Sequence, residues 1–276
     1  DYLARQPAPG PGPAVAVIVA QGEIRDGQAP AGQIGGASTA ALIRKTLQDR
    51  DVKALVLRVN SPGGSAFGSE LVRRELEDAR AKGVPVVVSM GDVAASGGYW
   101  IALSADEVIA DEATITGSIG VFGMLPTASG LMDKLSLRTG GYSTTWIAQG
   151  YDPRRPLDPR FAELVQTGID RIYADFTERA AVARKMKVEQ LDAVAQGRVW
   201  SGAQARERGL VDRNGLLGDA IRAAARRASL DEGAPVRWVD RAPGRWDRLL
   251  GWLQARDLQA LAVVLGAMDA ATLDAL

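Results

Sequence analysis

Short apolar runs alternate with amphipathic stretches along the first part of the chain. The runs at residues 14–19, 52–59 and 84–89 are rich in β-branched side chains and predict buried strands. Between them, helical spacing of apolar residues predicts helices at 38–49 and 70–82. Strands and helices that alternate at this short spacing are typical of βαβ units. The pattern therefore predicts an α/β fold built on a parallel sheet.

The same alternation continues through the second half of the chain. We predict a helix that begins near Ser96, a strand at 107–110, and the longest helix at 159–184. The segment 21–36 is rich in glycine and is predicted to be a loop. The long helix carries one wide apolar stripe at i, i+3 and i+4 steps: Phe161, Leu164, Val165, Ile169, Ile172, Tyr173 and Phe176.

Three regions of different composition divide the chain. Residues 1–13 are rich in proline and glycine, and we interpret them as a linker, as in the latter part of a longer protein. Residues 14–240 form one continuous domain. Residues 241–276 are predicted to be an amphipathic helical tail. The tail packs on the domain or on a neighbouring subunit, or its two tryptophans, Trp246 and Trp252, contact a membrane surface.

Charge and composition exclude several classes of function. Lys+Arg and Asp+Glu are both 33, so there is no basic excess and no nucleic-acid partner is predicted. The chain has no cysteine and no histidine, which excludes a Ser-His-Asp triad and nearly every catalytic zinc site; no cofactor or metal is expected. A serine nucleophile would therefore need another base, usually lysine. No apolar run is long enough to span a bilayer.

Two glycine-rich turns follow successive predicted strands. They are Ser61-Pro62-Gly63-Gly64-Ser65 and Ala94-Ala95-Ser96-Gly97-Gly98-Tyr99. Ligands of parallel α/β sheets bind at the carboxyl ends of strands, and paired glycines present free backbone amides there. Ser96 could point its hydroxyl into a cleft while neighbouring amides bind the oxyanion of a tetrahedral intermediate.

Each turn also has a purely structural explanation. Ser96 could serve only as the N-cap of its helix, and the first glycine pair could be a type II turn. Phosphate binding is a further alternative, although no GxxxxGK[ST] pattern is present. The two turns together favour an acyl-binding or acyl-transfer site.

Four longer motifs carry a resemblance to a known family. They are VKALVLRVNSPGGS at 52–65, VPVVVSMGDVAASGGYWIA at 84–102, TGSIGVFG at 116–123 and GRVWSGAQARERGLVD at 197–212. In this order they closely resemble the signal peptide peptidase A family of the crotonase/Clp-protease superfamily. The resemblance is closest to the C-terminal half of its long, tandem-repeat form. It implies a crotonase/Clp-protease-like fold of repeated ββα units around a parallel sheet.

The resemblance also implies residue roles. Ser96 would be the nucleophile, the amides of Gly64 and Gly97 would form the oxyanion hole, and Ser118 would orient a catalytic lysine. The implied activity is that of a serine endopeptidase with a Ser/Lys dyad that degrades cleaved signal peptides and other apolar peptides. The implied setting is a homo-oligomer, for example a tetramer, on the periplasmic side of the bacterial inner membrane. Its anchor would lie in a segment outside this chain.

The chain departs from its single-repeat relatives at the lysine. Residues 140–150, where such a relative carries the base, contain none. Lys134 is predicted to lie in a helix, and Lys185 and Lys187 at the far end of the long helix. Lys45, Lys53 and Lys82 are predicted to lie in solvent at the ends of helices and strands. We therefore expect the base from the N-terminal repeat, which this sequence does not contain.

Two other functions are compatible with the sequence. A crotonase-type acyl-CoA enzyme would share the fold and oxyanion hole, and a catalytically silent scaffold or interaction domain would need no base. If the chain is a peptidase, an apolar cleft lining is expected from Val93, Ile119, Val121, Phe122 and Met124. Such a lining would favour extended, uncharged peptides with small or aliphatic residues at the cut.

Overall fold

The computed structural model describes residues 12–30, 32–231 and 233–240. The predicted tail, 241–276, lies outside these residues, as does all of the predicted linker before residue 12. The fold and the site below are built from the described residues alone.

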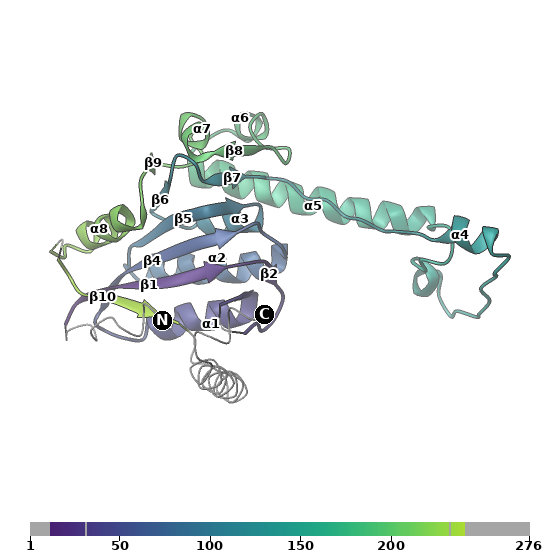
Figure 1. Cartoon of the computed structure of the whole chain (residues 1–276), viewed down its shortest axis with the longest axis horizontal. Helices are drawn as coiled ribbons and strands as arrows, with labels where there is room; N and C mark the ends of the chain where they lie inside the picture. Colours follow the sequence, from purple (N-terminus) through teal and green to yellow (C-terminus); the bar gives the residue numbers. More distant parts are fainter. Residues whose placement is uncertain (1–11, 31, 232, 241–276) are drawn as a thin grey trace, which may run out of the picture.

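A mostly parallel sheet forms the centre of the molecule (Figure 1). Its strands are β1 (Ala14–Gln21), β4 (Val52–Ser61), β5 (Val86–Ala95), β6 (Glu107–Ala110), β7 (Ile115–Gly117), β8 (Val199–Ser201), β9 (Arg213–Asn214) and β10 (Val236–Val239). The order is β10-β1-β4-β5-β6-β9, with β7 paired to β5 and to β8. Only the β7–β8 pair is antiparallel among these described strands. The predicted α/β fold with a parallel sheet is confirmed.

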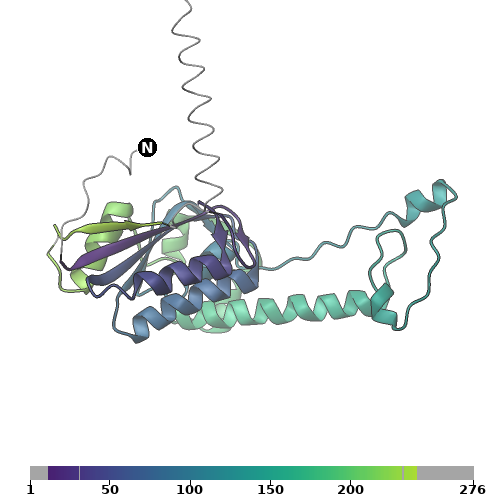
Figure 2. The ribbon, with the colours of Figure 1, turned by 90° about the horizontal axis from the view of Figure 1, so that it is seen from below.

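Helices cover both faces of this sheet. The described helices are α1 (Gly36–Thr46), α2 (Ala66–Ala81), α3 (Gly97–Ala102), α4 (Ser129–Lys134), the 3₁₀ helix η2 (Trp146–Gln149), α5 (Pro159–Arg184), α6 (Val188–Asp192), α7 (Gly202–Glu207) and α8 (Leu217–Arg227), of which α4 and η2 lie away from the sheet. Figure 2 shows α1 and α2 side by side under one face, while α8 lies on the other. The sheet is therefore the middle of three layers.

Alternating side chains of the central strands point into two separate cores. In β1, Val15 and Val17 pack with Ala220 and Ala224 of α8, whereas Ile18 belongs to the larger core that includes α1 and α2. Successive residues of a strand point to opposite faces, so a strand covered on both sides needs a continuous apolar run. This requirement explains why the central strands are mostly hydrophobic on both faces.

Several predicted boundaries change in the structure, and the first helix, predicted at 38–49, is found at Gly36–Thr46. The segment 21–36 is not only a loop, because β2 (Ile24–Arg25) and β3 (Ile34–Gly35) pair there as a small parallel sheet. The second helix begins earlier, at Ala66, where the Ser65 hydroxyl accepts a hydrogen bond from the Gly68 amide at 2.9 Å. Strand β5 continues to Ala95, so the second glycine-rich turn follows it without a gap.

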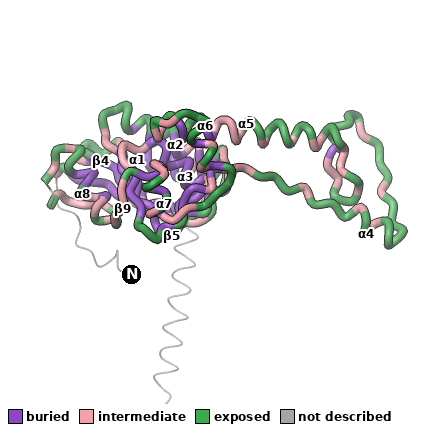
Figure 3. The backbone as a smooth tube through the Cα atoms, turned by 90° about the horizontal axis from the view of Figure 1, so that it is seen from above, coloured by how far each residue is buried: buried purple, intermediate pink, exposed green. Residues whose placement is uncertain are grey.

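A long arm projects from the body of the molecule (Figures 1 and 2). We define the arm as residues 121–171, which include α4, η2 and the first half of α5. Gly150 is its only buried residue, and Figure 3 shows the arm as almost entirely exposed or half-buried. The apolar stripe of α5 therefore divides in two: Phe176 is buried in the body, while Leu164 is exposed on the arm.

Candidate active site

The two glycine-rich turns lie against each other at the ends of the neighbouring strands β4 and β5. Gly63 has a φ of 107°, and a Cβ placed on it would lie 2.8 Å from the Ser96 Cβ and 2.7 Å from the Gly97 amide nitrogen. Such distances are too short for non-bonded atoms, so the turns can meet only because residue 63 has no side chain. The structure thus brings together the two turns that the sequence singled out.

Strand β2 holds the first turn in place. The Ile24 amide donates to the Gly63 carbonyl at 2.8 Å, and the Ser65 amide donates to the Ile24 carbonyl at 2.8 Å. Gly64 lies between these bonds with a φ of 140°, and a Cβ there would lie 2.2 Å from the Ile24 carbonyl oxygen. Within the described part of the chain, the amides of Gly64 and Gly97 have no hydrogen-bond acceptor. Both amides are therefore available to a ligand.

Ser96 has a strained backbone at the junction of β5 and α3. Its φ of 51° and ψ of −118° are unusual for a residue with a side chain. Its amide donates to the Gly117 carbonyl and its carbonyl accepts from the Trp100 amide, both at 2.9 Å. Although Ser96 occupies the N-cap position, its side chain makes no capping hydrogen bond. The N-cap alternative therefore lacks the interaction that would define it, and strain of about 1–3 kcal/mol at such a position is typical of functional sites.

A bulge in β5 directs this strand toward the site. Val59 of β4 pairs with Met90 and Ser61 pairs with Ala94, so β5 carries additional residues between the two pairs. The Asn60 side-chain oxygen accepts from the Val93 amide at 3.1 Å inside the bulge. Beyond the bulge, β5 pairs with β7 instead of β6. This change of partner places Ser96 beside the end of β7.

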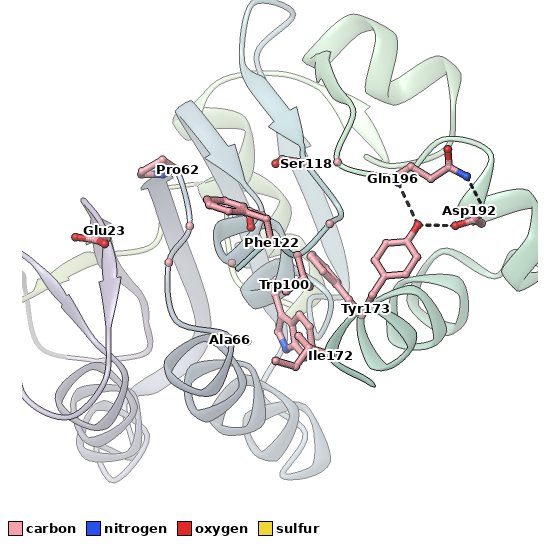
Figure 4. A pocket seen from close by; sticks show the side chains of 18 residues that line it. Glu23, Pro62, Ala66, Trp100, Ser118, Phe122, Ile172, Tyr173, Asp192 and Gln196 are labelled. Carbon is pink, nitrogen blue, oxygen red and sulfur yellow. Dashed lines mark hydrogen bonds between the residues drawn. The ribbon is translucent and has the colours of Figure 1, made fainter. Parts of the chain in front are cut away.

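Ser118 lies just after β7 and faces the same cavity as Ser96. Its φ is 50°, and its amide donates to the Arg198 carbonyl at 2.7 Å. Ser96, Ser118, Gly64 and Gly97 all line one cavity of about 1040 Å³. Figure 4 shows Ser118 at its rim, across from Pro62 of the first turn. The structure therefore groups all four residues that the resemblance implicated.

One wall of the cavity is apolar. Trp100 of α3 and Phe176 of α5 lie with ring centroids 4.6 Å apart, and Ile172 and Phe122 extend this wall (Figure 4). Of the five apolar residues expected to line the cleft, Val121 and Phe122 do so. The expectation is wrong for the other three: Ile119 is buried in the core, Met124 is exposed on the arm, and Val93 lies outside the lining.

Beside this apolar wall the cavity lining is polar. The Tyr173 hydroxyl donates to Asp192, and the Gln196 side-chain amide donates to the other Asp192 oxygen at 2.9 Å (Figure 4). These hydrogen bonds hold the pKa of Asp192 below its ordinary value, whereas burial and the Asp192 contact raise the pKa of Tyr173. Asp192 and Glu23 are the only charged residues among those that line the cavity in the described structure.

None of the six lysines lines the cavity. Lys134 lies in α4, at the end of the arm far from the body (Figure 1). Lys185 ends α5 and Lys187 precedes α6, while Lys45, Lys53 and Lys82 lie at α1, β4 and the end of α2. The chain therefore places a serine, but no lysine amine, in this cavity.

Most residues of the cavity walls were not predicted from the sequence. Ile172, Tyr173 and Phe176 were visible as part of the helical stripe, which could have indicated them. Trp100 lies one helical turn after Ser96, a second usable signal. Asp192 and Gln196 belong to no recognisable pattern, and only packing brings them to the site.

Among the described residues, no group of three or more acidic, histidine or cysteine side chains could hold a metal ion. No described helix has the length and apolar character needed to cross a membrane.

Comparisons with known proteins identify the family of the chain. The pattern of peptidase family S49 matches residues 78–231. The chain is 45% identical to Protease 4 of Salmonella typhi over 84% of its own length and 37% of that protein. It is 37% identical to the chloroplastic serine protease SPPA of Arabidopsis thaliana over 81% of its own length and 34% of that protein. It thus spans about a third of these two relatives, at 37% and 34%.

A solved structure shares the fold at low sequence identity. It is a point mutant of the membrane-bound stomatin-specific protease 1510-N, with a TM-score of 0.51, 13% identity, and coverage of 85% of this chain and 100% of that one. Together with the sequence relatives, this likeness in fold confirms the resemblance that the four motifs predicted.

Proposed function

The chain belongs to peptidase family S49, and from this premise we propose that it is the nucleophile-bearing part of a serine endopeptidase with a Ser/Lys dyad. One observation carries the proposal: Ser96 lies in a strained turn, faces a cavity, and has two unpaired glycine amides beside it. This arrangement resembles that of an activated nucleophile with an oxyanion hole.

The proposed reaction has two stages. The Ser96 oxygen attacks the scissile carbonyl carbon while its proton passes to the lysine amine, and the Gly64 and Gly97 amides bind the resulting oxyanion. The C–N bond then breaks as the amine returns the proton to the leaving nitrogen, which leaves an acyl-enzyme. Water, deprotonated by the same amine, hydrolyses the ester and regenerates Ser96.

The lysine is expected from an N-terminal repeat outside this chain. The absence of any lysine from the cavity lining of the described structure supports this source. A free lysine has a pKa of about 10.4 and must be desolvated to act near pH 7–8. An interface between repeats can bury the amine, and the Ser118 hydroxyl at the cavity rim could accept a hydrogen bond that orients it.

The cavity supports extended, apolar peptides as substrates, among them remnants of cleaved signal peptides. Trp100, Phe122, Ile172 and Phe176 offer an apolar wall for one side chain of such a peptide. The acidic residues Glu23 and Asp192 disfavour a carboxylate side chain beside the scissile bond.

The arm supports assembly into a homo-oligomer, with a tetramer as one arrangement. Its exposed apolar side chains are Phe122, Met124, Leu131, Leu135, Leu137, Tyr142, Trp146, Ile147 and Leu164. Exposed apolar side chains in this number are typical of a contact surface. We place the assembly on the periplasmic side of the bacterial inner membrane, with an anchor outside the described residues.

Active-site labelling tests the proposal. The enzyme assembled with its N-terminal repeat is treated with a fluorophosphonate, and peptide mapping by mass spectrometry should find the adduct on Ser96. An adduct on another residue would contradict the assignment. If no serine reacts and no uncharged peptide is cleaved, the alternative of a catalytically silent scaffold is correct. Binding of an acyl-CoA would favour the crotonase-type enzyme instead.

A further inference from the structure

The orientation of Trp100 depends on one hydrogen bond outside the cavity. The Trp100 side chain lines the cavity wall but is only 5% exposed, packed against Phe176. Its indole N–H donates to the Glu70 Oε2 atom of α2 at 2.9 Å. A buried indole N–H is costly without an acceptor, so this bond favours one orientation of the ring.

Glu70 is itself held by cations from two helices. Arg73 donates to both Glu70 carboxylate oxygens, at 2.7 and 3.0 Å, and Arg179 of α5 lies 3.6 Å from one of them. Arg73 is in turn anchored to the buried Ser104 hydroxyl at 2.6 Å. Glu70 therefore links α2, α3 and α5 at the back of the cavity wall.

The Glu70 carboxyl group is ionised at neutral pH. Burial alone would raise its pKa, but hydrogen bonds from Arg73 and Trp100 outweigh burial and hold the pKa below its ordinary value. An ionised carboxylate can only accept hydrogen bonds, and the indole N–H can only donate one, so the two groups always pair in the same direction. The acceptor for Trp100 is thus always present above acidic pH.

Trp100 lies one helical turn after Ser96, and its amide donates to the Ser96 carbonyl at 2.9 Å. A rotation of its ring would therefore change the depth of the apolar wall beside the nucleophile without moving the two glycine-rich turns. We propose that Glu70 is a positioning residue that, through Trp100, determines the size of the side chain accepted next to the scissile bond. This inference rests on the proposed function, because it requires the cavity to bind peptides.

A neighbouring glutamate offers a matched control. Glu77 is on the same helix and accepts from the same Arg73 at 3.0 Å, but its side chain is 59% exposed and Trp100 is not among its hydrogen-bond partners. Glu77→Gln removes a carboxylate partner of Arg73 and leaves the Trp100 acceptor in place. A general loss of the α2 ion pairs would affect both positions, whereas positioning of Trp100 is specific to Glu70.

The test measures peptide binding, so it does not depend on catalysis. In the 276-residue chain with Ser96→Ala, calorimetry compares uncharged blocked hexapeptides with Ala, Leu or Phe before the scissile bond. We expect Glu70→Leu to weaken binding of the Leu and Phe peptides about tenfold relative to the Ala peptide, which corresponds to about 1.4 kcal/mol. Glu70→Gln, which keeps an acceptor oxygen, and Glu77→Gln should both retain most of the original preference.

Other outcomes separate the possible failures. An equal loss for all three peptides, or an equal change in Glu77→Gln, would overturn the positioning role while leaving the proposed function intact. No binding of any peptide, either to the parent chain or to the Ser96→Ala enzyme assembled with its N-terminal repeat, would overturn the proposed function and this inference with it. Glu70→Met, an unbranched apolar replacement, repeats the test should Glu70→Leu fail to fold. In a Trp100→Phe background, which lacks the N–H, Glu70→Leu should change the preference far less.

Discussion

The body and the arm of this protein follow opposite rules of burial. Every residue of β5 except Asp92 and Val93 is buried, whereas Gly150 is the only buried residue of the arm. Yet the arm is not polar: Phe122, Met124 and Tyr142 are 90%, 78% and 93% exposed. A body that buries its apolar residues is stabilised by its own chain, while an arm that exposes them is suited to contact another surface.

The two regions meet at the cavity. The body contributes Ser96 and the glycine amides, and the arm leaves the body just after Ser118 and returns through α5, whose Ile172 and Phe176 form part of the wall. The proposed nucleophile thus lies in the body, while the proposed base would come from a partner that the chain contacts.

The largest expected effect belongs to the nucleophile of the body. In the assembled enzyme, Ser96→Ala should lower kcat for an uncharged peptide by more than about 10³-fold, because acyl transfer loses its attacking oxygen. The melting temperature should stay within a few degrees. Ser136→Ala is the matched control, since Ser136 is an arm serine that also has a positive φ, 54°. Substantial peptidase activity in Ser96→Ala would remove Ser96 as nucleophile.

The next effect concerns the base. The chain alone should show little turnover, and addition of the N-terminal repeat should raise kcat/KM by about 10²–10⁴-fold, the usual contribution of general-base catalysis. Steady-state kinetics on an apolar fluorogenic peptide measure the difference. Lys134→Ala should change nothing, because Lys134 lies at the far end of the arm. A fully active isolated chain that loses activity on Lys134→Ala would show that the base is internal.

The oxyanion hole should give an intermediate effect. In Gly64→Ala the new Cβ would meet the Ile24 carbonyl oxygen at 2.2 Å, so the turn must shift and the Gly64 amide must move with it. We expect kcat to fall about 10²–10³-fold, as when one oxyanion donor is lost. Gly83→Ala provides the control: its φ is 79°, but its Cβ would meet nothing within 4 Å. A similar loss of kcat in both variants would argue for general destabilisation.

Charged substitutions on the arm are expected to have the smallest effect on the stability of the body. Leu131→Asp combined with Leu135→Asp places charges at α4, where both side chains are more than half exposed at 57% and 58%. Analytical ultracentrifugation should show a shift toward smaller species, while the melting temperature of the body should hardly change. An unchanged sedimentation profile would mean that α4 lies outside the oligomer contact, and a large drop in melting temperature would contradict the independence of the two regions.

Local patterns in the sequence determined much of this protein. Apolar runs predicted β1, β4 and β6 closely, and helical periodicity predicted α5 with both of its ends. The glycine pairs located the two turns. These strands, helices and turns depend on residues close together in sequence, where side-chain spacing and backbone preference act directly. The absence of histidine excluded a histidine base, and the family resemblance led us to expect the lysine from outside this chain.

Only the tertiary structure decided how distant segments meet. The stripe of α5 has the same periodicity on the arm as in the body, so its sequence could not show that Leu164 is exposed and Phe176 buried. The bulge that turns β5 toward β7 depends on Asn60 in the neighbouring strand, and the hydrogen bond between Glu70 and Trp100 joins residues 30 positions apart. Such contacts are set by strand register and helix packing, which no local pattern encodes.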